Sequence, residues 1–397
     1  MDDQSKSIVR RTGLPESESR PVVTPLYPSV VYRSQSPDQL DAIYEGELPG
    51  YTYAREGHPN ASVLAEKIDW LEGASGGVIT GSGMSAVSAV FLGLLAAGDQ
   101  ILAGDQLYGR TARLLTQDLP RMGFHADLVD ATSATAMEQA IRPETKMIFV
   151  EVVTNPTLRV ADMEAIARLA REHDLLLVVD NTFTTPRAFR PLDHGADIVL
   201  HSITKLLAGH SDVTLGYVVA KDEQQNQALI DAVVTWGLTP SPWDCWLAER
   251  GLHSFDLRFE RVQKNAVALA DFLGEQPGIE QVIYPGRADH PDHERACSLV
   301  NGNFGNMVSF RLAGGRAAAN ALTLAAPHLA FAPTLGDIGT TLSHPASSSH
   351  RALSSEEREA LGMTEGFFRV SVGIEDIELL KREFGESIKA AQKAADA

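Results

Sequence analysis

Residues 175–180 read LLLVVD and residues 196–205 read ADIVLHSITK. Each stretch is a short, continuous apolar run, typical of a strand buried on both faces, and each ends in polar residues. Buried strands of this kind belong to parallel sheets that are covered by helices on both sides. Ligands bind at the carboxyl ends of the strands in such sheets. The two stretches therefore predict an α/β fold and mark Asp180 and Lys205 as candidate site residues.

The first 250 residues repeat this alternation of short apolar runs and amphipathic stretches. Further strands are expected over 76–81, 99–104, 146–153 and 215–220, and helices over 62–73, 85–95, 112–123 and 163–174. The alternation predicts a mostly parallel central sheet with helices on both faces.

The pattern of expected helices and strands changes at both ends of this region. After residue 250, a long amphipathic helix over 254–276 precedes strands expected over 279–286, 304–312 and 367–374, which indicates a smaller C-terminal α+β domain. The first 50 residues are rich in Pro, Ser and Gly and predict an extended arm that packs on something else. We therefore expect an arm over 1–58, a large domain over 59–250 and a C-terminal domain over 251–397.

Composition limits the classes of function. The chain has 397 residues, 44% of them hydrophobic, and a formal net charge of −18, which disfavours nucleic acids and anionic membranes as partners. The two cysteines, Cys245 and Cys297, form no metal-binding pattern and fit a reducing compartment, so we expect a cytoplasmic protein without a metal. The N-terminus lacks the apolar stretch of a secretory signal, and glycines interrupt the uncharged stretch 73–98, so no membrane span is expected.

Two further places follow or interrupt apolar runs. Gly81-Ser82-Gly83-Met84 follows an expected strand and opens a helix, where free backbone N–H groups bind phosphate; a simple tight turn is the alternative. Arg369 lies within the apolar stretch FFRVSVG, where a guanidinium meets either a planar carboxylate of a substrate or a structural ion-pair partner.

Asp180 and Lys205 also each allow a functional and a purely structural interpretation. Asp180 either pairs with a protonated pyridine nitrogen or caps the next turn. Lys205 follows Ser202 and Thr204 and is either a Schiff-base lysine beside phosphate-binding hydroxyls or a surface residue of a loop. A phosphate nest, a pyridine-facing acid and a Schiff-base lysine together are what a pyridoxal 5′-phosphate (PLP) site needs, so the combination predicts a PLP enzyme.

The motifs then point to a family. The stretches 178–186 (VVDNTFTTP), 196–212 (ADIVLHSITKLLAGHSD), 284–293 (YPGRADHPDH), 342–350 (LSHPASSSH) and 368–378 (FRVSVGIEDIE) occur in order. Over about residues 25–378 the chain resembles the Cys/Met-metabolism family of fold-type-I PLP enzymes, which contains cystathionine γ-synthases, cystathionine lyases, methionine γ-lyases and O-acylhomoserine sulfhydrylases.

The resemblance implies a role for each matching residue. Lys205 would carry the cofactor, Asp180 would pair with its pyridine nitrogen, Tyr108 would stack on its ring, and Asn155 would lie near its ring hydroxyl. The phosphate would be bound by Ser82, Gly83, Met84, Ser202 and Thr204, and by Tyr53 and Arg55 from a neighbouring subunit. Arg369, seated by Thr334, would bind the α-carboxylate of an amino-acid substrate. The shared site implies a homotetramer built from two catalytic dimers.

Departures from the family pattern bear on specificity. Cystathionine γ-lyases have a Glu before the Tyr-x-Arg motif and another before Ser-Leu-Gly, where this chain has Thr52 and Pro333. We therefore expect cystathionine to be a poor substrate. Arg110 and Arg113 suit a substrate with an anionic distal group if their side chains face the pocket. We expect a PLP-dependent lyase that performs γ-elimination on a methionine- or homoserine-type amino acid; a γ-replacement transferase is the alternative.

Two other classes compete with an enzyme of this family. A dinucleotide-dependent dehydrogenase shares the α/β pattern, but the sequence lacks GxGxxG with an acid about 20 residues on. A non-catalytic PLP-binding protein is disfavoured because Lys205, Asp180, Tyr108 and Arg369 are all present.

Overall fold

The computed structural model describes residues 17–351 and 353–396. Its main feature is a seven-stranded, mostly parallel sheet, which confirms the predicted fold class. Five neighbouring strands run parallel, and β7 is antiparallel to both β6 and β1. The strands lie in the order β1 (Val78–Thr80), β7 (Gly216–Ala220), β6 (Ile198–Ser202), β5 (Leu176–Asp180), β4 (Thr145–Glu151), β2 (Gln100–Gly104) and β3 (His125–Val129).

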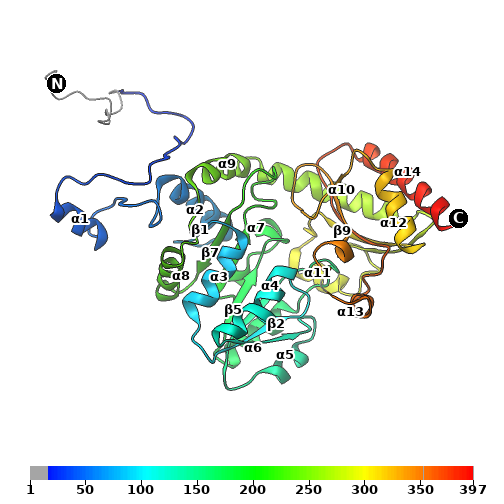
Figure 1. Ribbon diagram of the computed structural model, residues 1–397, viewed down its shortest axis with the longest axis horizontal. Helices are drawn as coiled ribbons and strands as arrows, with labels where there is room; N and C mark the ends of the chain where they lie inside the picture. Colours follow the sequence, from blue (N-terminus) through cyan, green and yellow to red (C-terminus); the bar gives the residue numbers. More distant parts are fainter. Residues whose placement is uncertain (1–16, 352, 397) are drawn as a thin grey trace.

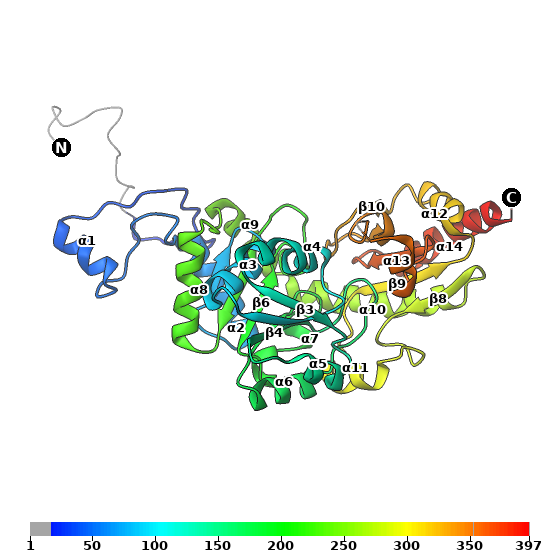
Figure 2. The same ribbon diagram turned by 60° about the horizontal axis from the view of Figure 1, so that its bottom comes forward.

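Helices cover both faces of this sheet. In Figure 2, α3 and α4 lie on one side of the strands and α5 and α6 on the other. Alternate residues of each buried strand face opposite sides: Val178 packs with α3, whereas Val179 packs with α6. The helices of this region are α2 (Pro59–Glu72), α3 (Gly83–Leu94), α4 (Gly109–Arg113), α5 (Ala134–Ala140), α6 (Met163–Glu172), α7 (Thr185–Ala188), α8 (Glu223–Thr235) and α9 (Pro242–Leu252).

A second, five-stranded sheet follows in sequence, in the order β10 (Ala330–Phe331), β11 (Thr341–Ser343), β12 (Phe367–Ser371), β9 (Met307–Leu312) and β8 (Ile279–Ile283). Its helices are α10 (Phe255–Gly274), α11 (His293–Val300), α12 (Gly315–Leu324), α13 (Ser355–Ala360) and α14 (Ile377–Ala395). Helix α10 contributes Phe259 to the core beside the large sheet and Leu269 to the core of the small sheet. The domain boundary at residue 250 stays a prediction.

Part of the N-terminal segment extends away from the rest of the chain, although Thr24 bonds to Glu249 of α9 and Tyr27 to Asn60 of α2. Figure 1 shows α1 (Pro37–Tyr44) standing off the body at one end of the long axis, with α14 at the opposite end. Helix α1 has no buried residue. Residues 1–16 of the expected arm, including the stretch searched for a secretory signal, lie outside the described residues. No helix among the described residues combines the length and apolar character needed to cross a membrane.

Local differences from the expected elements have identifiable causes. The single helix expected over 112–123 is wrong: α4 passes into a π-helical turn at Leu114–Asp118 and a 3₁₀ turn at Leu119–Met122. Pro120 lacks the N–H that an α-helix needs, and Gly123 ends the segment with a φ of 90°. Strand β3 was missed because it is a partly exposed edge strand without a continuous apolar run.

Candidate active site

A cavity of about 230 Å³ opens at the carboxyl ends of the parallel strands. Residues from β4, β5 and β6 line it together with residues 333–335 and Arg369 of β12, so both sheets contribute to one site. The structure brings eleven of the predicted site residues to this cavity: Ser82, Gly83, Met84, Tyr108, Asn155, Asp180, Ser202, Thr204, Lys205, Thr334 and Arg369.

The start of helix α3 forms one wall. Ser82 is the N-cap, and its side chain accepts a hydrogen bond from the N–H of Ser85 at 3.0 Å. The N–H groups of Gly83 and Met84, in the first helical turn, have no partner within the helix and are free for an anion. A Cβ at Gly83 would lie 2.7 Å from Cβ of Ser202, so only glycine allows α3 to approach β6 this closely.

Lys205 lies just beyond β6 and is largely buried. Burial, and to a smaller extent the charge of Arg369, lower the pKa of Lys205 to about 8. The backbone of Lys205 packs tightly against the loop between β10 and β11 of the small sheet. A Cβ added at Gly336 in this loop would lie 2.9 Å from Cα of Lys205. The backbone of Lys205 therefore has little room to move, and its amine is closer to the neutral, nucleophilic form than that of an exposed lysine.

Two carboxyl groups lie next to each other on neighbouring strands. Asp180 ends β5 and pairs in register with Glu151, which ends β4. Asp180 accepts the N–H of Thr182 at 3.0 Å, and Glu151 accepts the N–H of Tyr108 at 2.6 Å. Burial raises the pKa of both groups; for Glu151, whose pKa is raised well above its usual value, the charge of Asp180 adds to the effect. Of the two carboxyl groups, Glu151 therefore has the pKa that is raised well above its usual value.

Arg369 on β12 is buried and has two of its nitrogens occupied. Nη1 donates to Oδ1 of Asn155 at 2.6 Å, and Nη2 donates to the carbonyl of Thr334 at 2.9 Å. Its Nε is buried and has no hydrogen-bond partner within the described chain. Thr334 thus contacts Arg369 through its backbone carbonyl, and the Asn155 side chain contacts Arg369. Arg369 also lines the cavity, and a guanidinium in a cavity is suited to a carboxylate.

Four predicted site residues do not line the cavity of their own chain. Tyr53 and Arg55 are exposed on the N-terminal segment, with the Arg55 guanidinium 5.4 Å from the centre of the Tyr53 ring. Arg110 and Arg113 are exposed on α4, and Arg113 lies 3.6 Å from Asp118. Their roles at a neighbouring site and at the distal end of a substrate stay predictions.

Glu151 is a cavity residue that sequence reasoning missed. The apolar pattern of 146–153, KMIFVEVV, predicts only a strand. The signal was nevertheless present, because Glu151 interrupts an apolar run near the carboxyl end of a buried strand. The same reasoning that selected Asp180 at the end of β5 applies to it.

These features fit one cofactor. A lysine of lowered pKa, free N–H groups at a helix start and a buried acid within the same cavity are what pyridoxal 5′-phosphate requires of a protein. Over residues 6–389 the chain matches the model of the family described as Cys/Met metabolism PLP-dependent enzymes. The protein belongs to this family.

Its relatives within the Cys/Met metabolism family are of more than one kind. The chain is 41% identical to a cystathionine beta-lyase of Bacillus subtilis (strain 168), over 86% of this chain and 87% of that one. It is 38% identical to an L-methionine gamma-lyase of Fusobacterium nucleatum subsp. polymorphum, over 89% and 90%. A crystal structure of cystathionine gamma synthase from Xanthomonas oryzae pv. oryzae, with aminoacrylate and cysteine, superposes with a TM-score of 0.89 at 36% identity, covering 94% of each chain. The protein is therefore a PLP-dependent enzyme of sulfur amino-acid metabolism.

Proposed function

We propose that this enzyme is a carbon–sulfur or carbon–oxygen lyase that performs γ-elimination on a methionine- or homoserine-type L-amino acid. With methionine, the substrate and water would give 2-oxobutyrate, ammonia and methanethiol. The observation that carries the proposal is the placement of Lys205 and Arg369 in one cavity whose acids, Glu151 and Asp180, both lie at the ends of neighbouring strands.

Arg369 binds the α-carboxylate of the substrate. Its Nε is the donor without a partner among the described residues, and Asn155 and the Thr334 carbonyl hold the guanidinium in a fixed plane. A substrate carboxylate that accepts a hydrogen bond from Nε would remove the free-energy cost of leaving this buried donor unpaired. The same contact would orient the amino group of the substrate towards Lys205.

Lys205 moves protons at the substrate. When bound, PLP supplies the electron sink that stabilises negative charge on the substrate carbons. With a pKa of about 8, the Lys205 amine is able to accept a proton from one carbon and return it at another near neutral pH. Asp180 would pair with the pyridine nitrogen, Tyr108 would cover the ring, and the start of α3 with Ser202 and Thr204 would hold the phosphate.

The uncharged loop residues that line the cavity support the choice of substrate. Among the residues of the described chain that line the cavity, residues 333–335 and 348–349 carry no charge. At the two positions where cystathionine γ-lyases have glutamates, Pro333 lines the cavity and Thr52 donates to Glu56 at 2.8 Å outside it. A distal ammonium would find no carboxylate among these residues, which favours neutral or anionic distal groups.

γ-Replacement is the second candidate. The likeness to a cystathionine gamma synthase supports it, and elimination and replacement share the removal of the γ-substituent. The two reactions differ in whether a thiol adds to the γ-carbon afterwards, so the outcome depends on access of the thiol. Both candidates use the same Lys205, Asp180 and Arg369.

One assay panel tests the proposal. Purified holoenzyme is offered methionine, cystathionine, homocysteine, O-acetylhomoserine and O-succinylhomoserine, each with and without a thiol. The products 2-oxobutyrate and thioether are then quantified. Elimination predicts 2-oxobutyrate as the main product even when thiol is present. A thioether as the main product would contradict elimination and support replacement, and β-elimination of cystathionine to pyruvate as the only reaction would contradict both.

The assembly belongs to the same proposal. We infer a homotetramer of two catalytic dimers in the cytoplasm, with Tyr53 and Arg55 of each chain reaching the phosphate of the neighbouring site. The exposed position of both side chains on a segment that extends from the body supports this arrangement (Figure 1). The free thiols of Cys245 and Cys297 support the location.

A further inference from the structure

The loop between Val153 and Val160, here called the Asn155 hairpin, follows β4 directly. Its two ends form an antiparallel bridge, and the N–H of Thr154 donates to the carbonyl of Arg159 at 2.9 Å. Leu158 is fully buried and has a φ of 55°, a left-handed conformation that costs free energy in a residue with a Cβ. Such a conformation persists when the surrounding structure holds it.

On one side the Asn155 hairpin contacts the carboxylate-binding arginine. Asn155 accepts the 2.6 Å hydrogen bond from Arg369. The next residue, Pro156, accepts a 2.7 Å hydrogen bond from the hydroxyl of Ser309, and Ser309 is the strand partner of Arg369 on β9. The position of the hairpin therefore fixes the position of the guanidinium.

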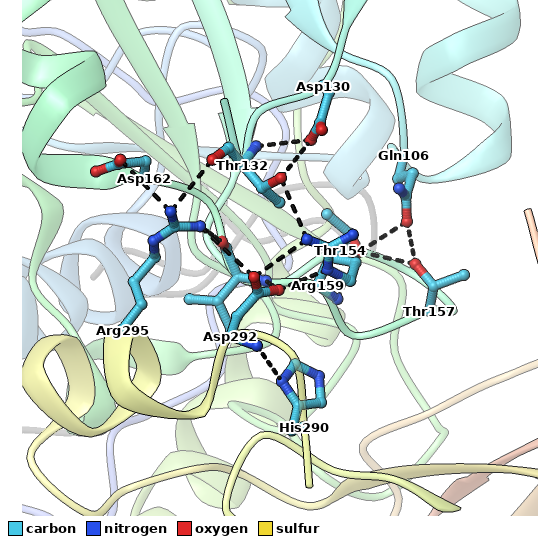
Figure 3. Close-up of polar contacts among 11 residues, drawn as sticks. Gln106, Asp130, Thr132, Thr154, Thr157, Arg159, Asp162, His290, Asp292 and Arg295 are labelled. Atoms are coloured by element: carbon cyan, nitrogen blue, oxygen red, sulfur yellow. Dashed lines mark hydrogen bonds and ion pairs between the residues drawn. The ribbon is translucent and has the colours of Figure 1, made fainter. Parts of the chain in front are cut away.

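On the other side the hairpin is bound by a single buried acid. Figure 3 shows Asp292 facing Arg159, with both carboxylate oxygens engaged. Nε of Arg159 donates to Oδ2 at 2.6 Å and Nη2 donates to Oδ1 at 3.1 Å, while the N–H of Val160 donates to Oδ2 at 3.0 Å. Arg295 adds a 2.9 Å bond to the carbonyl of Val160. The acid thus holds both the side chain and the backbone at the end of the hairpin.

The electrostatics agree with a permanent charge at this place. Burial alone would raise the pKa of Asp292, but the hydrogen bonds from Arg159 and Val160 outweigh it and hold the pKa below its usual value. The bidentate geometry fixes orientation as well as distance.

Asp292 lies in the motif 284–293, which the cofactor site leaves unexplained. The motif's other acid, Asp289, pairs with Arg287 at the surface and contacts no part of the hairpin in the described structure. His290 accepts the N–H of Asp292 at 3.1 Å and so orders the turn that presents the acid (Figure 3).

We propose that Asp292 is a positioning residue for substrate binding: through Arg159 it holds the Asn155 hairpin so that Asn155 and Arg369 form one preorganised carboxylate site. The inference rests on the proposed role of Arg369. Removing the charge of Asp292 leaves the Arg159 guanidinium without its carboxylate and loosens the hairpin, while Lys205, Asp180 and the start of α3 stay in place. The loss therefore falls on substrate binding.

The test compares holoenzyme variants Asp292→Asn and Asp289→Asn. The second changes the exposed acid of the same motif and serves as the matched control. Kinetics on the best substrate of the panel give KM and kcat, and titration with glycine, followed by the absorbance of the bound cofactor, gives a binding constant without turnover. Asp292→Asn is expected to raise KM and the glycine dissociation constant about ten-fold, with kcat within about three-fold of wild type and full PLP content. Asp289→Asn is expected to behave as wild type.

Two further variants make every outcome decisive. Arg159→Lys keeps the positive charge but loses the bidentate contact, and an intermediate rise in KM is expected even if Asp292→Asn does not fold. Unchanged KM and glycine binding, or a fall in kcat alone with loss of PLP, would overturn the inference. Arg369→Lys separates the two proposals. If it raises KM while Asp292→Asn and Arg159→Lys do not, only the positioning role fails; if it too leaves KM unchanged, the proposed carboxylate site fails as well.

Discussion

The backbone N–H of Tyr108 donates to Oε1 of Glu151 over 2.6 Å. This bond ties the residue proposed to stack on the cofactor to the end of strand β4. Glu151 is 7% exposed and stands beside Asp180 in the strand register, so two carboxyl groups share the floor of one cavity. Burial and the charge of Asp180 raise the pKa of Glu151 well above its usual value.

Substitutions at Glu151 separate its hydrogen bond from its charge. Glu151→Gln keeps a carbonyl oxygen as acceptor for Tyr108 and is expected to leave kcat within about three-fold of wild type. Glu151→Ala leaves a buried N–H unpaired, a cost of about 1–3 kcal/mol, so about a ten-fold or larger fall in kcat/KM is expected. Steady-state kinetics at constant PLP content decide the matter, and equal losses in the two variants would show that the carboxylate charge is needed.

Lys205 gives a prediction about the stability of the apoprotein. Its pKa is about 8 in the folded chain, against a usual 10.5. Below pH 8 the folded chain must bury the positive charge of Lys205, which lowers the free energy of unfolding. Between pH 8 and 10.5 the unfolded chain binds a proton that the folded chain has lost. The contribution of Lys205 to the free energy of unfolding therefore rises with pH. Lys205→Met should therefore stabilise the apoprotein at pH 7 by at most about 3 kcal/mol, with a difference that shrinks towards pH 10.5.

Urea unfolding of PLP-free protein at several pH values measures this difference. Lys389→Met, at an exposed position of α14, is the control and should show no comparable pH-dependent gain. A destabilised Lys205→Met apoprotein at pH 7 would contradict the lowered pKa. The same substitution, like Lys205→Ala, should abolish turnover in the presence of PLP and remove the yellow colour that borohydride treatment bleaches in the wild type.

Asp180→Asn should fold and bind PLP but slow turnover by about a hundred-fold or more, because a neutral amide cannot keep the pyridine nitrogen protonated. The side-chain oxygen of asparagine still accepts the N–H of Thr182, so the local turn is preserved. The measurement is kcat at matched PLP content. Near-normal turnover would show that Asp180 acts only as a cap for the turn.

The strand ends could be predicted because burial leaves a strong trace in the sequence. Continuous apolar runs located β5 and β6, and the polar residues after them were Asp180, Ser202, Thr204 and Lys205, all of which line the cavity. Glu151 shows the limit of this reasoning, because an acid within a run was treated as part of the strand.

Contacts between distant segments left no such trace. Asp292 binds Arg159 across 133 residues of sequence, and Asn155 binds Arg369 across 214. No helical or strand periodicity relates residues so far apart in sequence, so these pairs depend on how the two sheets and their loops pack. The sequence pattern also could not place Arg110 and Arg113, because the expected helix began at residue 112 whereas α4 begins at Gly109.

Subunit mixing tests the shared site. Arg55→Ala and Lys205→Ala proteins are expected to be weakly active or inactive separately. If Arg55 serves the site of the neighbouring chain, one of the two sites in a mixed dimer carries both native residues, and activity should return after subunit exchange. Recovery is measured against the same proteins incubated apart. Proven exchange without recovery would place Arg55 outside the partner's site.

Specificity for the distal group of the substrate is tested by a gain of function at Pro333. This residue lines the cavity and is exposed, so a longer side chain there has room to reach the substrate. Pro333→Glu should raise kcat/KM for cystathionine relative to methionine, since a charged hydrogen bond to the distal ammonium contributes about 1.5–3 kcal/mol, or about ten- to a hundred-fold. Pro333→Gln matches the shape of glutamate without its charge and should change the ratio of kcat/KM values much less. Arg110→Ala should lower kcat/KM for O-succinylhomoserine if Arg110 reaches the pocket in the assembled enzyme. A wild-type enzyme that already prefers cystathionine strongly, with a ratio that neither Pro333→Glu nor Arg110→Ala alters, would mean that another part of the site recognises the distal group.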